Sequence, residues 1–293
     1  MTPTFTRAAE LLGTWIADVE RGEQPMRFLL AEPFAGLDVR PGRLLMFGGQ
    51  PGSGKTAALL QMGTDLLRNN ESARLLIGNV EMAPPLLVER MVARLSAVPL
   101  TAIADRTLTA DELRRVRAAV DALEPLAGRL AFLQSPYSLE HLAAAASAFG
   151  ANVLIVDYVQ RFTVGDGSKD KREQLETAAT ILRRFCDVGA AVLVASAVAR
   201  QKNHGGSTYR GLNLASFRGS SELEYGCDAA YLVVPDESGG VHFACEKNRF
   251  GTVADVPTSF DPTVQTFTPA PSGLSAFDAA TPAPARGNRS KGK

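Results

Sequence analysis

The chain has 293 residues, of which 45% are hydrophobic and 21% are charged. This balance is typical of a globular protein with a sizeable core, and it excludes a largely disordered or fibrous chain. The 31 basic residues equal the 31 acidic ones, which argues against a broad nucleic-acid-binding face but allows a narrow basic strip.

The first predicted element is an amphipathic helix over residues 6–21. Its apolar residues recur at helical spacing, namely Leu11, Leu12, Trp15, Ile16 and Val19. Gly22, followed by Pro25, is a typical helix end. A single helix has no core of its own, so it must pack either on the body of the same chain or on a neighbouring subunit.

From Phe34 onward, apolar strands alternate with amphipathic helices. Strands are predicted at residues 43–48, 74–80, 130–134, 152–157, 191–196, 229–234 and 241–247. Helices are predicted at residues 55–69, 84–96, 109–123, 138–149, 171–187 and 219–225. The nearly continuous apolar strands are typical of a parallel sheet buried on both faces, and the strands after residue 229 suit antiparallel pairing. One doubly wound α/β domain is the expected result.

The strongest local signal is Gly-Gln-Pro-Gly-Ser-Gly-Lys-Thr at residues 49–56, which matches the Walker A phosphate-loop pattern. Glycines permit the positive φ angles that let backbone N–H groups surround phosphate oxygens, and the helix that follows directs its positive end at them. Lys55 would contact the β- and γ-phosphates, and the Thr56 hydroxyl would bind Mg²⁺. The predicted nucleotide contacts are Gly49, Gln50, Pro51, Gly52, Ser53, Gly54, Lys55, Thr56 and Ala57.

Two carboxylates follow strands that should end near this loop. Asp157 closes the apolar run 153–156, which is the position of a Walker B aspartate in the Mg²⁺ shell. Glu81 follows the strand at residues 75–80 and could polarise the attacking water. The alternative for Glu81 is a helix-start carboxylate, because Pro84 opens the next helix.

Two cations, Lys247 and Arg249, end the strand predicted at residues 241–247. ATPases stabilise transition-state charge with an arginine supplied in cis or by a partner, so Arg249 is a candidate for that role. The alternative is a solvated strand end.

In this order, the segments resemble the RecA-like motor domain of the DnaB replicative helicases over residues 6–268. The segments that carry the resemblance are residues 34–42, 79–82, 156–160, 217–228 and 247–249. The resemblance implies that Glu81 is the catalytic base and that Asp157 is the Walker B aspartate. It also implies that Lys247 and Arg249 reach the γ-phosphate of the neighbouring subunit.

The family implies an α/β, RecA-like P-loop NTPase with a mostly parallel sheet flanked by helices. Residues 1–30 would be a linker helix that docks on the adjacent subunit, residues 31–268 the motor domain, and residues 269–293 a disordered, Pro/Ala-rich basic tail. The implied activity is that of a helicase: ATP hydrolysis with Mg²⁺ between the subunits of a hexameric ring that translocates on single-stranded DNA during replication. Few residues precede the helix, so a primase contact of the family's usual type is not expected.

One departure from the family concerns the segment after the strand at residues 191–196. The family carries S-Q-x-N-R there, whereas residues 196–200 read S-A-V-A-R. The Ala197 side chain cannot form a hydrogen bond, so we expect the coupling of hydrolysis to DNA to be weakened or rerouted. Two alternatives stay open: a RadA- or RecA-like recombination ATPase, and a DNA-linked ATP switch or loader that does not translocate.

DNA contacts are predicted in two segments, residues 161–171 and 201–210, with Lys202 and Arg210 as the candidate cations. Solvated surface loops are the alternative for both. The three scattered cysteines fit reduced structural thiols, and the isolated histidines argue against a metal cluster. Apolar stretches fall short of membrane-spanning length, so we expect a cytoplasmic protein without a membrane partner.

Overall fold

The computed structural model describes residues 6–165, 170–198, 201–203, 206–208, 221–235 and 240–271. The tail predicted to be disordered lies outside the described residues from residue 272 onward. Arg210 lies outside them as well, and so does the side chain of Lys202.

Within the described residues, nine strands form one central sheet in the order β11-β10-β9-β8-β1-β5-β4-β2-β3. The strands are β1 (Leu44–Gly49), β2 (Leu75–Asn79), β3 (Leu130–Phe132), β4 (Val153–Asp157), β5 (Ala191–Ala197), β8 (Ala229–Pro235), β9 (Val241–Asn248), β10 (Val256–Asp261) and β11 (Thr266–Pro269). Neighbouring strands from β8 through β3 pair in parallel, whereas β9, β10 and β11 pair antiparallel. The mostly parallel α/β sheet is therefore confirmed, and antiparallel pairing begins at β9.

The helices are α1 (Ala8–Arg21), α2 (Lys55–Asn69), α3 (Pro84–Ser96), α4 (Leu100–Ala104), α5 (Ala110–Ala127), α6 (Leu139–Phe149), α7 (Lys171–Asp187) and α8 (Ser221–Gly226). A short 3-10 turn, η1 (Val159–Arg161), follows β4, and β6 (Gln201–Asn203) pairs with β7 (Gly206–Thr208) as a separate hairpin. Connections through helices or loops between parallel strands bring the carboxyl ends of β1, β5, β4 and β2 to one edge of the sheet.

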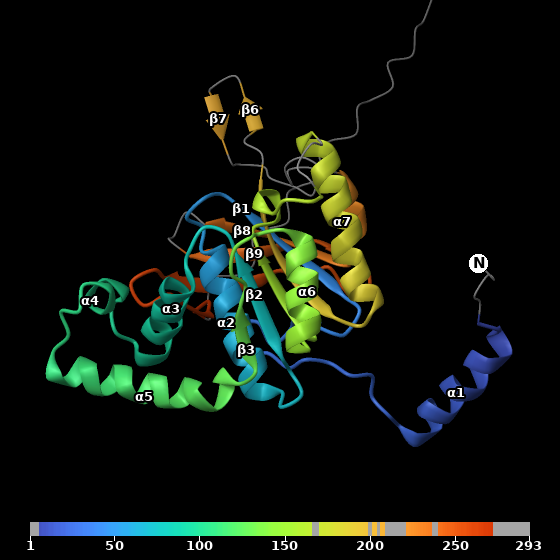
Figure 1. The fold of residues 1–293 in the computed structure, drawn as a ribbon, viewed down its shortest axis with the longest axis horizontal. Helices are drawn as coiled ribbons and strands as arrows, with labels where there is room; N and C mark the ends of the chain where they lie inside the picture. The colour runs from blue at the N-terminus through green and yellow to red at the C-terminus, as the bar shows by residue number, and fades with distance from the viewer. Residues whose placement is uncertain are drawn as a thin grey trace, which may run out of the picture.

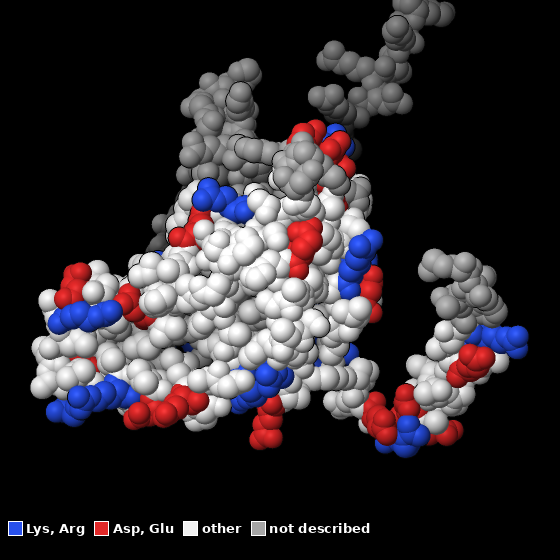
Figure 2. All heavy atoms as spheres, in the orientation of Figure 1, with Lys and Arg blue, Asp and Glu red and all other residues white. Residues whose placement is uncertain are grey.

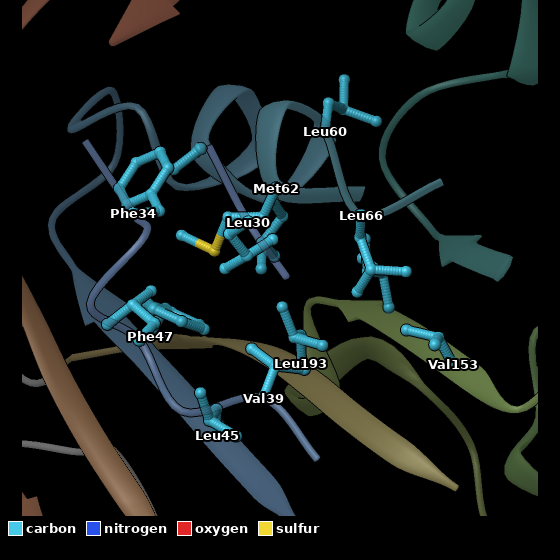
Figure 3. Packing of buried hydrophobic residues seen from close by; sticks show 14 of the residues in the cluster. Leu30, Phe34, Val39, Leu45, Phe47, Leu60, Met62, Leu66, Val153 and Leu193 are labelled. Atoms are coloured by element: carbon cyan, nitrogen blue, oxygen red, sulfur yellow. The ribbon is translucent and has the colours of Figure 1, made fainter. Parts of the chain in front are cut away.

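The sheet is buried on both faces because its side chains alternate between two hydrophobic clusters. Leu45, Phe47 and Leu193 pack with Met62 and other residues of α2 on one face (Figure 3). The strand residues between them, such as Met46, pack with α6 and α7 on the other face. Nearly continuous apolar strands are the sequence pattern that such double burial requires.

Helices α3, α4 and α5 form a lobe beside the sheet (Figure 1). A small cluster of its own holds this lobe together, with Val92, Val98, Ile103 and Ala119 among its buried residues. The capping box at Thr109 and Glu112 begins α5 with reciprocal hydrogen bonds.

Helix α1 forms as predicted and ends at Gly22, whose φ of 67° is left-handed. None of its residues is buried, and the helix stands apart from the sheet and its covering helices (Figure 1). Trp15 is 62% exposed and Leu12 is 63% exposed. The apolar stripe of α1 is thus uncovered within a single chain, contrary to the alternative that it packs on its own core.

Cys186, Cys227 and Cys245 are free and buried. Burial raises the pKa of the Cys186 thiol to about 12 and that of Cys227 to about 11. In the described part of the chain, no group of three or more His, Cys, Asp or Glu side chains is placed to hold a metal ion. No described helix combines the length and the apolar character needed to cross a lipid bilayer.

Candidate functional site

A cavity of about 420 Å³ opens at the carboxyl edge of the parallel strands. Three separate predicted elements meet there: the phosphate loop, the turn after β2 and the end of β4. The predicted site residues that line it are Gly49, Pro51, Gly52, Gly54, Lys55, Thr56, Ala57, Glu81 and Asp157. The structure therefore brings the phosphate loop and both predicted carboxylates together.

The phosphate loop connects β1 to α2. Gly52 and Gly54 have φ values of 80° and 91°, a left-handed conformation that glycine adopts readily. Helix α2 begins at Lys55, so its first N–H groups face the loop. The Lys55 ammonium group donates hydrogen bonds to the carbonyl oxygens of Gly49 and Gln50, each at 2.8 Å.

A buried hydrogen-bonded group joins α2 to the ends of β4 and β2. The Thr56 hydroxyl donates to Asp157 Oδ2 at 2.6 Å, and Asn79 Nδ2 donates to the same oxygen at 2.8 Å. Burial raises the pKa of Asp157, while the Thr56 hydrogen bond and the Lys55 charge lower it. Burial also lowers the pKa of Lys55, which the charges of Asp157 and Glu81 oppose. A hydroxyl and a carboxylate side by side are oxygen ligands that suit Mg²⁺.

The turn that carries Glu81 is held by Asn79. Asn79 Oδ1 accepts hydrogen bonds from the backbone N–H groups of Glu81 and Met82, at 2.9 and 2.8 Å. Since Asn79 also donates to Asp157, its register partner across β2 and β4, one side chain links the Asp157 carboxylate to the backbone of the turn that carries Glu81. In the sequence analysis, Asn79 appears only within the segment at residues 79–82. The signal that could have identified it is its position at the end of one predicted strand, since a neighbouring strand ends in Asp157.

Sequence reasoning missed four further residues that line the cavity: Arg90, Phe260, Pro262 and Gln265. Arg90 lies on α3 and donates a hydrogen bond to the Gln265 side chain, which follows β10. Burial lowers the pKa of Arg90, and the charge of Asp157 opposes this effect. No local motif marks these residues, because the hairpin of β10 and β11 reaches the phosphate loop only through tertiary packing.

Ala197 ends β5, between β1 and β4, and lines the same cavity. The end of this strand is held by Gln160, whose Nε2 donates to Ser196 Oγ at 2.7 Å and whose Oε1 accepts from the Ala197 N–H at 3.1 Å. The sheet therefore places residue 197 beside the end of β4, where its side chain offers no hydrogen bond. The expected change in DNA coupling stays a prediction.

Lys247 and Arg249 do not join the cavity. Strand β9 runs antiparallel to β8, so residue 249 lies at the edge of the sheet where β1 begins. Arg249 Nη1 contacts Asp228 Oδ1 at 3.1 Å, and Asp228 Oδ2 accepts from the Leu44 N–H at 3.0 Å. Leu44 and Gly49 are five residue steps apart, or about 17 Å at roughly 3.3 Å per step. The two predicted cations thus lie at the edge opposite the phosphate loop.

The predicted DNA segments are only partly described. Lys202 lies in β6, which pairs with β7, and the stretch from residue 166 to residue 169 lies outside the described residues. On the face shown in Figure 2, the described Lys and Arg side chains are interspersed with Asp and Glu, as the balanced charge predicts.

Comparisons with known proteins agree with this geometry. The chain resembles a solved structure whose title describes an ATPase domain, with a TM-score of 0.79 and 16% identity over 91% of this chain and 99% of that one. It also resembles "The Structure Of A DnaB-Like Replicative Helicase And Its Interactions With Primase", with a TM-score of 0.75 and 15% identity over 90% of this chain and 67% of that one. These likenesses confirm the predicted RecA-like fold.

No curated protein sequence matches the chain. The family model described as "DnaB-like helicase C terminal domain" matches residues 30–269, which is most of the chain. The sheet order, the phosphate loop and this match lead to one conclusion: the chain belongs to the DnaB-like helicase C-terminal domain family.

Proposed function

We propose that this chain is an ATP-driven helicase motor of the DnaB type. It hydrolyses Mg-ATP between the subunits of a hexameric ring and thereby moves along single-stranded DNA during replication. The observation that carries the proposal is the placement of Arg249 at the sheet edge opposite the phosphate loop. An arginine in that place cannot serve its own chain's nucleotide, but it can serve the nucleotide of a neighbour in a ring.

Within one subunit, the phosphate loop and Lys55 bind the phosphates, while Thr56 and Asp157 hold the cation. Mg²⁺ held by these two residues would supply positive charge that offsets the negative charge of the phosphates. Glu81 orients the attacking water and takes its proton as the bond from the water oxygen to the γ-phosphorus forms and the bond to the ADP oxygen breaks. The Asn79 hydrogen bonds to the turn support this role, because they fix the backbone position from which the Glu81 side chain extends.

The neighbouring subunit completes the site in this proposal. Its Arg249 and Lys247 approach the γ-phosphoryl group and stabilise the charge that spreads over its oxygens in the transition state. The uncovered apolar stripe of α1 supports an assembly in which this helix packs on the next subunit. Lys202 and Arg210 would contact the DNA backbone from the ring's central opening.

A second candidate function is an ATP switch that does not translocate. The observation that favours it is that Ala197, which lines the cavity, stands where the family carries a glutamine. Without a side-chain hydrogen bond at that position, hydrolysis would proceed but would be transmitted to DNA by another route or not at all.

Strand displacement separates the two candidates. We expect the full chain to unwind a forked DNA with ATP and Mg²⁺, and we expect Lys55→Ala to lose both hydrolysis and unwinding. The matched control is Arg114→Ala, which removes an exposed cation that pairs with Asp111 on α5 and should leave both activities unchanged. ATP hydrolysis that DNA does not stimulate, without strand displacement, would contradict the motor and support the switch.

A further inference from the structure

We infer that Asp228, together with the last carbonyl groups of α8, positions Arg249 and Lys247 for their reach into the neighbouring subunit. This inference rests on the proposed function, since it concerns how the trans-acting cations are held. Asp228 lies just before β8, is only 2% exposed, and serves no part of the nucleotide cavity of its own chain.

Asp228 holds Arg249 through both its main chain and its side chain. The Asp228 carbonyl oxygen accepts from the Arg249 N–H at 2.8 Å, and Asp228 Oδ1 accepts from Arg249 Nη1 at 3.1 Å. The carboxylate is itself fixed, because Oδ2 accepts from the Leu44 N–H at 3.0 Å and from Arg183 Nη1 at 2.7 Å. A charge-assisted pair with one fixed partner restricts the directions that the guanidinium group can take.

The C-terminal end of α8 supplies the second half of the support. Arg249 Nη2 donates to the Tyr225 carbonyl oxygen at 3.2 Å. Lys247 Nζ donates to the carbonyl oxygens of Glu224 and Tyr225, at 2.6 and 3.2 Å. The last carbonyl groups of a helix have no partner within it and carry partial negative charge, so two cations are well placed there.

The turn that carries Arg249 is also held from its other side. The Arg43 guanidinium lies 4.1 Å from the centre of the Phe250 ring, and Arg43 forms an ion pair with Asp38. Asn248 closes the turn by donating to the Thr252 carbonyl oxygen at 2.9 Å. These contacts fix the backbone on both sides of residue 249, so the remaining freedom lies in the arginine side chain.

Burial and charge indicate positioning rather than a purely structural ion pair. The Arg249 side chain is 47% exposed although its partner is buried, so the guanidinium is anchored at the surface and remains accessible. Arg183 remains paired with Asp228 when Arg249 moves toward a phosphate, so the buried carboxylate is not left without a cation. Arg249 can therefore shift by a small distance without a large free-energy penalty.

The first test is Asp228→Asn, which keeps the shape of the side chain and removes its charge. We expect kcat for ATP to fall by about 10- to 100-fold, the range that small misplacements of a catalytic group cause. We expect KM to stay within about twofold, because the phosphate loop is at the other edge of the sheet. Asp187→Asn is the matched control, since Asp187 pairs with Arg183 at 3.5 Å but does not contact Arg249.

Mixed rings distinguish a positioning role from damage to the fold. Subunits with Lys55→Ala have a dead nucleotide site but an intact Arg249, and subunits with Asp228→Asn have the opposite defect. We expect a mixture of the two to recover ATP hydrolysis several-fold above the sum of the separate variants. Asp228→Glu, which keeps the carboxylate, should retain more kcat than Asp228→Asn and provides a second variant if the latter does not fold.

The same mixing experiment with Arg249→Ala tests the proposed function by itself. ATP hydrolysis in mixed rings could recover with Arg249→Ala but not with either folded Asp228 variant. That result would overturn the positioning role of Asp228 and leave the trans-acting role of Arg249 standing. Normal hydrolysis by Arg249→Ala alone would instead overturn the proposed trans function, and the role of Asp228 with it.

Discussion

Gly54 illustrates how much one residue of the phosphate loop depends on distant packing. Its φ is 91°, and a Cβ added to it would lie 2.8 Å from the Phe267 ring and 3.3 Å from the Phe260 ring. Those rings belong to β11 and β10, and they stack on each other with their centres 4.3 Å apart. The glycine therefore serves the backbone conformation of the loop and the close approach of the C-terminal hairpin.

We expect Gly54→Ala to lower the free energy of unfolding by about 1–3 kcal/mol more than Gly52→Ala, because overpacking adds to backbone strain only at residue 54. Gly52 is the matched control: its φ is 80°, and no described atom lies within 4 Å of the position that a Cβ would take there. Denaturant unfolding of both variants measures the difference. Equal losses of stability would contradict the prediction, because they would show that the two aromatic rings move aside without a cost in free energy.

Individual site residues differ in how well the sequence predicts them. The phosphate-loop residues and Asp157 follow local patterns, and the structure places them around one cavity. Asn79 depends on the register between β2 and β4, and Gln265 depends on a hairpin some two hundred positions from the loop. Such contacts arise from the pairing of distant strands, so no local spacing reveals them.

Helix α1 is the element whose apolar face has no cover within the chain. Its stripe residues are between 45% and 63% exposed, although their spacing is that of a buried helix face. An uncovered stripe of this kind typically marks an interaction with another protein surface. In this chain, the proposed occupant is the adjacent subunit of the ring.

We expect Trp15→Asp to lower the mass of the assembled oligomer without changing the unfolding temperature of the monomer, because Trp15 contacts no core of its own chain. Thr14→Asp is the matched control, since it adds the same charge to an exposed position outside the stripe. Native mass spectrometry measures both. An unchanged oligomer with Trp15→Asp would exclude α1 from assembly.

Most elements were predictable because their periodicity is strong. Every strand and helix predicted from the pattern is present, with ends that shift by a few residues, and α5 continues through Pro125 to Ala127. The sequence did not predict α4, β10 or β11, and residues 201–210 were predicted as a loop, where the structure has β6 and β7. Helix α4 has only five residues. In β10 and β11, apolar and polar residues do not alternate clearly, because several side chains on these strands are partly exposed.

On the scale of the whole molecule, the sheet separates two sets of predicted functional groups. Lys55 and Asp157 lie at its carboxyl edge, whereas Arg249 and Asp228 lie where β1 begins. Under the proposed function, a single chain therefore holds two half-sites that cannot meet in that chain. Neither composition nor net charge could predict this arrangement, because it follows from the antiparallel return of β9 along β8.

We expect the ATP hydrolysis rate per subunit to fall when the protein is diluted below the concentration at which it assembles, because each complete site needs two subunits. Nucleotide binding should persist, since the phosphate loop is complete in one chain. Hydrolysis measured over a dilution series, alongside the oligomer mass, tests this. A constant rate per subunit in samples that contain only monomers would contradict shared sites.

The buried cysteines have a practical consequence for the chemistry of the purified protein. Since the thiolate is the reactive form, a pKa raised by burial to about 12 leaves the Cys186 thiol almost wholly protonated at pH 7. Air oxidation and alkylating reagents should therefore spare this thiol while the core stays closed. Cys227 directly precedes Asp228 and is buried. The rate at which a thiol reagent labels Cys227 would therefore report how often the packing around Asp228 and Arg249 opens transiently.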